Sequence, residues 1–474
     1  MRRCPGGRSW RRAAWRLRCF RFVKIDCYSI ETNIQIFAVC ASVARRCGYP
    51  NRPDRGGGPM NFSARGLSAM FSVLRQRNFA IYTSGSTVSL IGTWMQRVTV
   101  GWLCWELTGS GAWLGLLAFA DMFPSVIVGP LAGAAADRWD RLRIARISQM
   151  LGLLQATFLF VALVAGFLTI ELLFAVVLFH GVVEAFNQPS RLALIHSLVG
   201  RERLGAAVAI NSIAFNLARF VGPAIAGVLI ATVGVAWAFA LNAMTFGAFA
   251  LALAAVSLVR DDALAPRSGF LREIVDGFAY SVRHPGIGPI LMLMIAAGVG
   301  GRAVVELLPG FAADVFGAGP IGLAALTSSV AVGAILGGFV VGVRQSYTGL
   351  TRTVIVSVFG IALAVAAFTV TDTLYLGAAA LAVAGFFMVT TGVGSQTLVQ
   401  LAVDGSMRGR VLSLHGLIFR GGPALGALLM GVSSEFAGLR LPVAVGAAIL
   451  AICAFFALTR VNAIADALEN EPRN

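Results

Sequence analysis

One short stretch decides how this chain folds: Gly133-Ala134-Ala135-Ala136-Asp137-Arg138-Trp139-Asp140-Arg141-Leu142-Arg143. It holds five charged side chains within seven residues, and it closes one long apolar run and opens another. A charge inside hydrocarbon costs several kcal/mol. These residues therefore lie at a membrane surface, in a tight turn between two spanning helices.

The composition agrees with a membrane protein. The 474 residues are 57% hydrophobic and 13% charged, whereas roughly a quarter of the residues in soluble domains are charged. The net charge is +16, of which +10 comes from residues 1–59, with 13 basic and 3 acidic side chains. No basic helix with interleaved aromatic residues accompanies this excess, so we attribute it to membrane orientation and expect no nucleic-acid partner.

Hydropathy predicts twelve spans of about 20 residues each. Their limits are 79–106, 111–136, 144–166, 171–196, 204–230, 235–259, 287–310, 319–343, 352–371, 375–401, 410–432 and 441–460. One long connection, 260–286, divides them six and six, and its apolar residues at intervals of four predict an amphipathic surface helix. The predicted fold is an all-α integral membrane protein with two six-helix bundles, 71–259 and 287–460, joined by this linker.

Arginine placement predicts the orientation, because cytoplasmic loops carry the basic excess. The connections after even-numbered spans contain Arg138, Arg141, Arg143, Arg146, Arg201, Arg203, Arg260, Arg267, Arg272, Arg283, Arg344, Arg408 and Arg410. The odd-numbered connections contain only Arg440. Both termini are therefore expected in the cytoplasm.

The two predicted bundles share a repeated sequence motif. Gly222-Pro223 in the fifth span and Gly422-Pro423 in the eleventh lie 200 residues apart, each shortly after an arginine, Arg219 or Arg420. Spans five and eleven are equivalent in two six-helix halves, as in the internal repeats of transporters. We expect these residues, with Gly227, to pack helices closely around a pseudo-two-fold axis.

The stretch from Gly133 to Arg143 resembles the loop between helices 2 and 3 of the major facilitator superfamily. The resemblance covers about 71–460 and, within the superfamily, points to the enterobactin-exporter branch, or transmembrane secretion effectors. The supporting motifs are Asn187-Gln188-Pro189-Ser190-Arg191, Asn211-Ser212, Ala218-Arg219-Phe220-Val221-Gly222-Pro223-Ala224 and Gly409-Arg410-Val411-Leu412-Ser413.

The resemblance implies a secondary transporter of the bacterial inner membrane that works by alternating access. It implies proton-coupled efflux of a siderophore, a drug or a similar amphiphilic molecule. The exporter signature of span five is usually a long glycine series, and only Gly222-Pro223 and Gly227 match it here. The direction of transport therefore stays open, and a facilitator or importer with the same fold is the alternative. A membrane scaffold without transport is a third reading.

A gating motif is expected at the turn after span two, formed by Gly133, Asp137, Arg138, Arg141 and Arg143. Asp137 can meet the positive N-terminal end of span eleven, which begins at the same membrane surface. Such a contact would latch the two bundles together in one state. The alternative is a solvated turn whose charges only set topology.

Ionisable residues inside the spans are costly and therefore informative. The candidates for proton coupling are Asp121, Glu184 and Glu306, and the candidate countercharges are Arg97, Arg191, Arg219, Arg302 and Arg420. Burial favours the neutral form of a carboxyl group and a nearby arginine favours the charged form, so Asp121 or Glu184 can load and release a proton. Static buried ion pairs are the alternative, and Arg302 and Glu306, four residues apart, can neutralise each other.

Several activities find no support in the sequence. Lys24 is the only lysine, so the spans contain no Walker motif, and no G-x-S-x-G occurs. The four histidines lack metal-ligand spacing, and we assign them to packing or to the surface. We expect no enzyme activity, no cofactor and no metal. The expected partners are a small-molecule substrate, protons and the lipid bilayer, and the chain is expected to be a monomer.

The ends of the chain lie outside the predicted bundles. Residues 1–70 contain no span and are expected to form a disordered N-terminal extension. Two interpretations are open: translation begins at Met60 or Met70, or the segment is an arginine-rich targeting arm. Residues 461–474 are expected to form a cytoplasmic tail.

Overall fold

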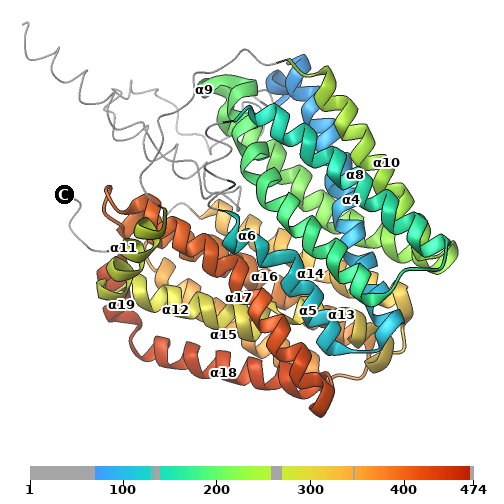
Figure 1. The fold of residues 1–474 in the computed structure, drawn as a ribbon. Helices are drawn as coiled ribbons and strands as arrows, with labels where there is room; N and C mark the ends of the chain where they lie inside the picture. The colour runs from blue at the N-terminus through green and yellow to red at the C-terminus, as the bar shows by residue number, and fades with distance from the viewer. Residues whose placement is uncertain (1–69, 130–131, 133–138, 258–269, 345–346, 470–474) are drawn as a thin grey trace, which may run out of the picture.

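The structure is a computed structural model that describes residues 70–129, 132, 139–257, 270–344 and 347–469. The described part is all-helical (Figure 1). Within it, ten helices or helical segments are long and apolar enough to cross a membrane. The fold is therefore that of a polytopic α-helical membrane protein.

The described helices form two packed groups. The first group contains α4 (Arg77–Thr108), α5 (Gly111–Met122), α6 (Pro124–Ile127), α8 (Arg141–Val164), α9 (Ile170–Thr232) and α10 (Val235–Ala255). The long α9 is two helices that meet at Gly200, where φ is 69° and the helix is interrupted. Its parts, Ile170–Gly200 and Arg203–Thr232, are separate candidate spans.

The second group follows the linker. It contains α11 (Phe270–Arg283), α12 (Ile287–Ala297), η1 (Gly298–Arg302), α13 (Val304–Gly310), η2 (Phe311–Val315), α14 (Gly319–Val343), α15 (Leu350–Val370), α16 (Leu374–Ala402), α17 (Arg408–Ala437), α18 (Arg440–Thr459) and α19 (Val461–Glu469). The segments α12 to η2 form one candidate span, Ile287–Val315, interrupted by two π-helical turns.

The ten predicted spans from 144–166 onward are confirmed as helices of spanning length. The predicted first span corresponds to α4, which is not among the ten because its interior face is polar. Ser89, Gln96 and Thr99 of α4 are buried at 0–4% exposure. Gln96 donates to Gln155 at 3.0 Å and accepts from Asn242 at 2.6 Å, so its amide is satisfied within the first group. The predicted second span corresponds to Gly111–Ile127, a shorter apolar helical segment.

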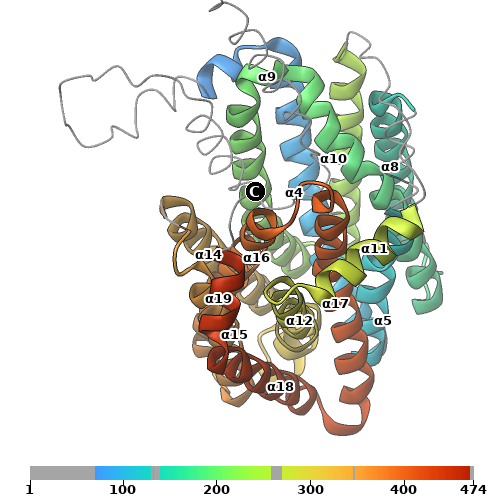
Figure 2. The ribbon, with the colours of Figure 1, turned by 90° about the vertical axis from the view of Figure 1, so that its left-hand side faces the viewer.

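The two groups touch along a seam formed by α5 against α17 and by α9 against α14. They approach each other most closely at the end where α5 begins and α17 ends, which we call the packed end. The helices of the two groups diverge toward the opposite end, which carries α11, α19 and the bend of α9 (Figure 1). We call this opposite end the open end. In Figure 2 the molecule is turned so that the left-hand side of Figure 1, where α11 and α19 lie, faces the viewer.

Two amphipathic helices lie at the open end of the second group (Figure 2). On α11, Val275, Phe278 and Val282 are 58–65% exposed along one face, as an amphipathic surface helix requires. The segment after Arg460 forms α19, whose Ile464 and Leu468 are buried. Glu469 at its end accepts from the backbone N–H groups of Gly349 and Thr351 at 2.6 and 2.8 Å, and so caps the first turn of α15.

Candidate functional site

An ion pair joins the two groups in the middle of the seam. The Arg97 guanidinium of α4 lies 2.7 Å from Glu306 of α13 and 3.8 Å from Asp121 of α5. Arg97 is eleven residues before the end of α4, which places it about 16 Å from the packed end at 1.5 Å per residue. One guanidinium thus holds two carboxylates at mid-membrane depth, one from each group.

Asp121 has further neighbours in the first group. His180 of α9 places Nδ1 3.4 Å from Asp121 Oδ1. Arg420 of α17 interacts electrostatically with Asp121 from the second group. The sequence alone predicts that His180 is a packing or surface residue. Its position four residues before Glu184, on one helix face, was the available signal.

Glu184 takes a different position from the other two candidate carboxylates. Its Oε2 accepts from Asn187 at 2.9 Å, and Asn187 also meets Gln149, which contacts Ser89. This polar chain runs through the interior of the first group. Glu184 is therefore bonded within the first group and is not an ion-pair partner of Arg97, although it interacts electrostatically with His180.

Glu306 pairs with Arg97 across the seam rather than with Arg302. Arg302 instead lies with its guanidinium 3.7 Å from the centre of the Phe419 ring and donates to the Phe419 carbonyl at 3.3 Å. The π-helical turn η1 precedes α13 and changes the phase of the helix just before Glu306. Of the two sequence alternatives, the intrahelical pair is not formed.

Two other intramembrane arginines are held by aromatic rings. Arg219 of α9 lies 5.6 Å from the centre of the Trp94 ring, and Arg97 lies at the same distance from that ring. Arg191 lies 5.3 Å from the Phe249 ring and donates to Ser86 inside the first group. Arg97 and Arg219 therefore face the seam, and Arg191 braces the first group.

The Gly-Pro pairs serve close helix packing. A Cβ on Gly222 would lie 2.7 Å from Trp94 Cβ, so α9 approaches α4 there, and a Cβ on Gly298 of η1 would lie 3.0 Å from Gly422 Cα. Pro223 and Pro423 follow directly inside α9 and α17. Each pair thus packs its helix against the first span of its own group, whereas Gly227 meets Ala324 of α14 across the seam.

The packed end is closed by a carboxylate as well as by glycine contacts. Glu435, near the end of α17, accepts from Ser110 Oγ at 2.6 Å and from the Ala112 N–H at 3.0 Å. It thereby caps the N-terminus of α5 from the other group. Gly111 and Gly431 lie against each other nearby. Glu435 carries no sequence signal of this role, because a lone acidic residue near a helix end has no distinctive spacing.

A paired glycine experiment tests how tightly the packed end is closed. Alanine at Gly115 would overlap the carbonyl oxygen of Ala427 across the seam, whereas alanine at Gly247 of α10 meets no atom within 4 Å. We expect Gly115→Ala to lower the free energy of unfolding by about 1–3 kcal/mol. Gly247→Ala should raise it by as much as about 1 kcal/mol, because alanine favours helix. Thermal unfolding in detergent measures both, and equal stability of the two variants would contradict this account of the seam.

The gating motif is only partly within the described residues. Gly133, Asp137 and Arg138 lie outside them, so the latch stays a prediction. The motif's second part begins α8, where Asp140 caps the helix by accepting from the N–H groups of Leu142 and Arg143. Arg141 and Arg143 follow in the first turn of α8.

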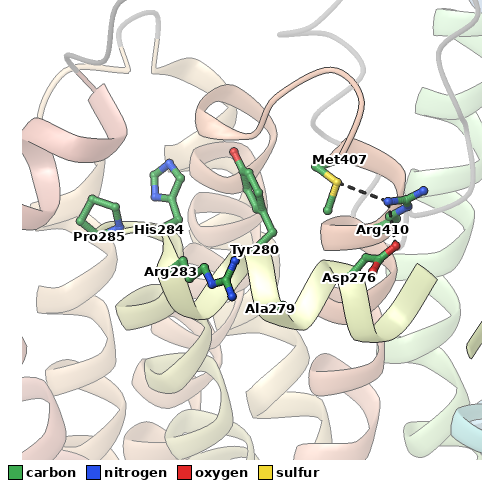
Figure 3. A pocket seen from close by; sticks show the side chains of 8 residues that line it. All are labelled: Asp276, Ala279, Tyr280, Arg283, His284, Pro285, Met407 and Arg410. Atoms are coloured by element: carbon green, nitrogen blue, oxygen red, sulfur yellow. Dashed lines mark hydrogen bonds and ion pairs between the residues drawn. The ribbon is translucent and has the colours of Figure 1, made fainter. Parts of the chain in front are cut away.

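A hollow of about 520 Å³ lies at the open end, between α11 and the start of α17 (Figure 3). It is lined by Asp276, Ala279, Tyr280, Arg283, His284, Pro285, Met407 and Arg410. Asp276 and Arg410 form an ion pair at 3.1 Å, and Tyr280 donates to Asp404 at the same distance. These contacts tie the linker helix to the first turn of α17, away from the seam. Across the described ranges, no three His, Cys, Asp or Glu side chains gather as a metal site.

Comparison with known proteins places this arrangement in a family. The family described as transmembrane secretion effector matches residues 68–474. The chain belongs to this family.

Three curated relatives illustrate the family. The staphyloferrin A transporter of Staphylococcus aureus is 27% identical over 371 residues, 76% of this chain and 90% of that protein. The multidrug efflux pump Tap of Mycolicibacterium fortuitum is 28% identical over 378 residues, 76% of this chain and 89% of that protein. The enterobactin exporter EntS of Citrobacter koseri is 29% identical over 348 residues, covering 72% and 76%.

Solved structures show the same fold. A bacterial homologue of the human lysosomal transporter Spinster, in an inward-facing and unoccupied conformation, gives a TM-score of 0.63 at 16% identity, covering 85% of this chain and 99% of that one. The nucleoside transporter NupG gives 0.61 at 16% identity, covering 83% and 99%. The chain thus has the fold of these transporters, and its family match and curated relatives place it among transporters of the major facilitator type.

Proposed function

We propose that this chain is an alternating-access exporter of a small amphiphilic molecule, driven by proton entry across the bacterial inner membrane. The Arg97–Glu306 ion pair carries the proposal, because it links the two groups at the depth where such transporters bind substrate and coupling ions. The names of the relatives, which include an enterobactin exporter and a multidrug efflux pump, favour export. A facilitator or importer with the same fold is the competing function.

The coupling step follows from the partners of Arg97. In the described conformation it holds Glu306 at 2.7 Å and Asp121 at 3.8 Å. When the groups rock apart at this level, Glu306 and Arg97 separate. A carboxylate that loses its cation in a low-dielectric site favours the neutral form and takes up a proton. Proton loading and the change of access are thereby linked through one arginine.

The architecture we propose has twelve spans in two six-helix bundles related by a pseudo-two-fold axis. The helix α4 and the α5–α6 pair complete the set of spans, and the polar face of α4 is turned inward against Gln155 and Asn242. The matching places of the two Gly-Pro pairs support the repeat. We further propose a monomer with both termini in the cytoplasm, which makes the packed end external and the described conformation inward-facing.

The test is uptake by everted membrane vesicles. A panel of enterobactin, a macrolide and a lipophilic dye is offered to vesicles that contain the full chain, with and without collapse of the proton gradient. We expect accumulation of at least one compound that stops when the gradient collapses. Vesicles from the same strain without the chain are the control. Equal accumulation of the compound in vesicles with and without the proton gradient would identify a facilitator instead.

A further inference from the structure

Arg219 is an arginine on the seam without a carboxylate of its own. Its guanidinium lies 5.6 Å from the centre of the Trp94 ring, and Arg97 lies 5.6 Å from the same ring. Arg219 makes no hydrogen bond and no ion pair with any residue in the described part of the chain. Two guanidinium groups therefore share one indole, and only one of them is ion-paired.

The charged groups near Arg219 already have partners. Arg219 interacts electrostatically with Arg97, which repels it, and with Glu306, which attracts it. Glu306 is already bound to Arg97, and Asp121 is shared by Arg97, His180 and Arg420. Arg219 is thus left without a carboxylate of its own, beside a second guanidinium on the same indole. Like charges in a low-dielectric setting repel strongly, and an anion that binds between them removes the penalty.

The position of Arg219 suits contact with cargo. It lies thirteen residues before the end of α9, about 20 Å from the packed end, so it is at nearly the same depth as Arg97. The next residue, Phe220, accepts from Ser328 of α14 through its carbonyl at 3.4 Å, and Gly227 packs on Ala324. Arg219 is therefore beside the surface along which the two groups move.

We infer that the transported molecule carries an anionic group, such as a carboxylate or phenolate, next to a flat aromatic part. The planar fork of Arg219 binds such a group through two parallel hydrogen bonds. Trp94 and Phe215, whose rings lie edge to face 5.8 Å apart, provide the apolar contact for the aromatic part. The inference rests on the proposed transport function and selects anionic cargo over cationic cargo. Outward movement of an anion is also favoured by a membrane potential that is negative inside.

Two xanthene dyes of similar shape and opposite charge test the inference: fluorescein, an anion, and tetramethylrosamine, a cation. Binding to the purified full chain in detergent is measured by fluorescence anisotropy. We expect the Kd of fluorescein to be lower than that of tetramethylrosamine by a factor of at least about ten. Arg219→Gln should weaken fluorescein binding about tenfold and leave tetramethylrosamine binding no weaker. Arg219→Lys, which keeps the charge, should recover part of the affinity.

The matched control is Arg460→Gln, because Arg460 is an exposed arginine at the end of α18, remote from Trp94. It should bind both dyes as the wild type does. Equal or tighter binding of tetramethylrosamine by the wild type would overturn the inference, as would unchanged fluorescein binding by Arg219→Gln. If Arg219→Gln does not fold, two other measurements test the inference: the preference of the wild type for fluorescein over tetramethylrosamine, and the affinity of Arg219→Lys for fluorescein.

Vesicle transport of the same dyes separates this inference from the proposed function. Fluorescein that binds through Arg219 but is never moved would refute transport and leave the anion site standing. Transport of tetramethylrosamine as fast as fluorescein would refute the anion preference and leave transport standing. An inside-negative potential imposed with valinomycin on right-side-out vesicles should accelerate loss of fluorescein, and no acceleration would count against anionic cargo.

Discussion

Replacement of Glu306 by glutamine is expected to reduce proton-driven accumulation by roughly tenfold or more, equivalent to about 1.4 kcal/mol of coupling. The amide keeps the size of the side chain but cannot change charge, so it cannot alternate between holding Arg97 and carrying a proton. Substrate exchange without a gradient needs no proton and should persist. Accumulation and counterflow in the same proteoliposomes measure the two activities.

A double-variant cycle with Arg97→Gln shows whether the two residues act as a pair. Residues in direct contact usually couple by about 0.5–3 kcal/mol, and the Arg97–Glu306 contact is only partly shielded, with side-chain exposures of 32% and 14%. We expect the double variant to be little worse than either single variant. Additive losses from the two substitutions would show that they act independently. Full proton-driven accumulation by Glu306→Gln would remove Glu306 from the coupling step.

The second large effect is expected at Asp121, with Glu184 as its matched control. Asp121 lies on the seam between Arg97 and His180, so Asp121→Asn should give a folded protein that exchanges substrate but no longer responds to a pH gradient. Glu184 is bonded to Asn187 inside the first group. Glu184→Gln should therefore keep its response to the gradient.

The readout is transport in vesicles across imposed pH gradients, with melting temperature as the measure of folding. A static ion pair predicts a different result, because loss of Asp121 would then lower protein yield and melting temperature together. The reverse pattern, with Glu184→Gln uncoupled and Asp121→Asn coupled, would move the proton site into the first group.

Much of the fold could be predicted because spanning helices obey simple rules. Ten spans from 144–166 onward appear as helices of the predicted length, since about 20 apolar residues are needed to cross hydrocarbon whatever the neighbours are. The first predicted span, α4, is not among these ten, because inward-facing polar residues such as Ser89 and Gln96, which bond to Gln149 and Gln155 of α8, lower its mean hydropathy. Hydropathy averages a helix around its axis and does not distinguish an inward polar face.

The candidate site was predictable in its residue types and not in its pairings. Intramembrane charges such as Arg97, Asp121 and Glu306 are visible in any sequence, because they interrupt apolar runs. Arg97 and Glu306 are 209 residues apart in the chain. Whether two such residues meet depends on the rotation of their helices and on the depth of each residue in the membrane. The π-helical turn before α13 changes that rotation locally, and no sequence periodicity marks it.

The sequence by itself determined that this protein is helical, lies in a membrane and carries its charges at span ends or in a few mid-span positions. Those properties depend on transfer free energies of single residues, which add along the chain. Only the tertiary structure decided that Glu306 pairs with Arg97 rather than Arg302, that Glu184 bonds to Asn187 within the first group, and that Arg219 faces Trp94 without a carboxylate of its own. These outcomes depend on contacts between helices, and the free energy of an ion pair depends on the distance between its two charges and on their burial.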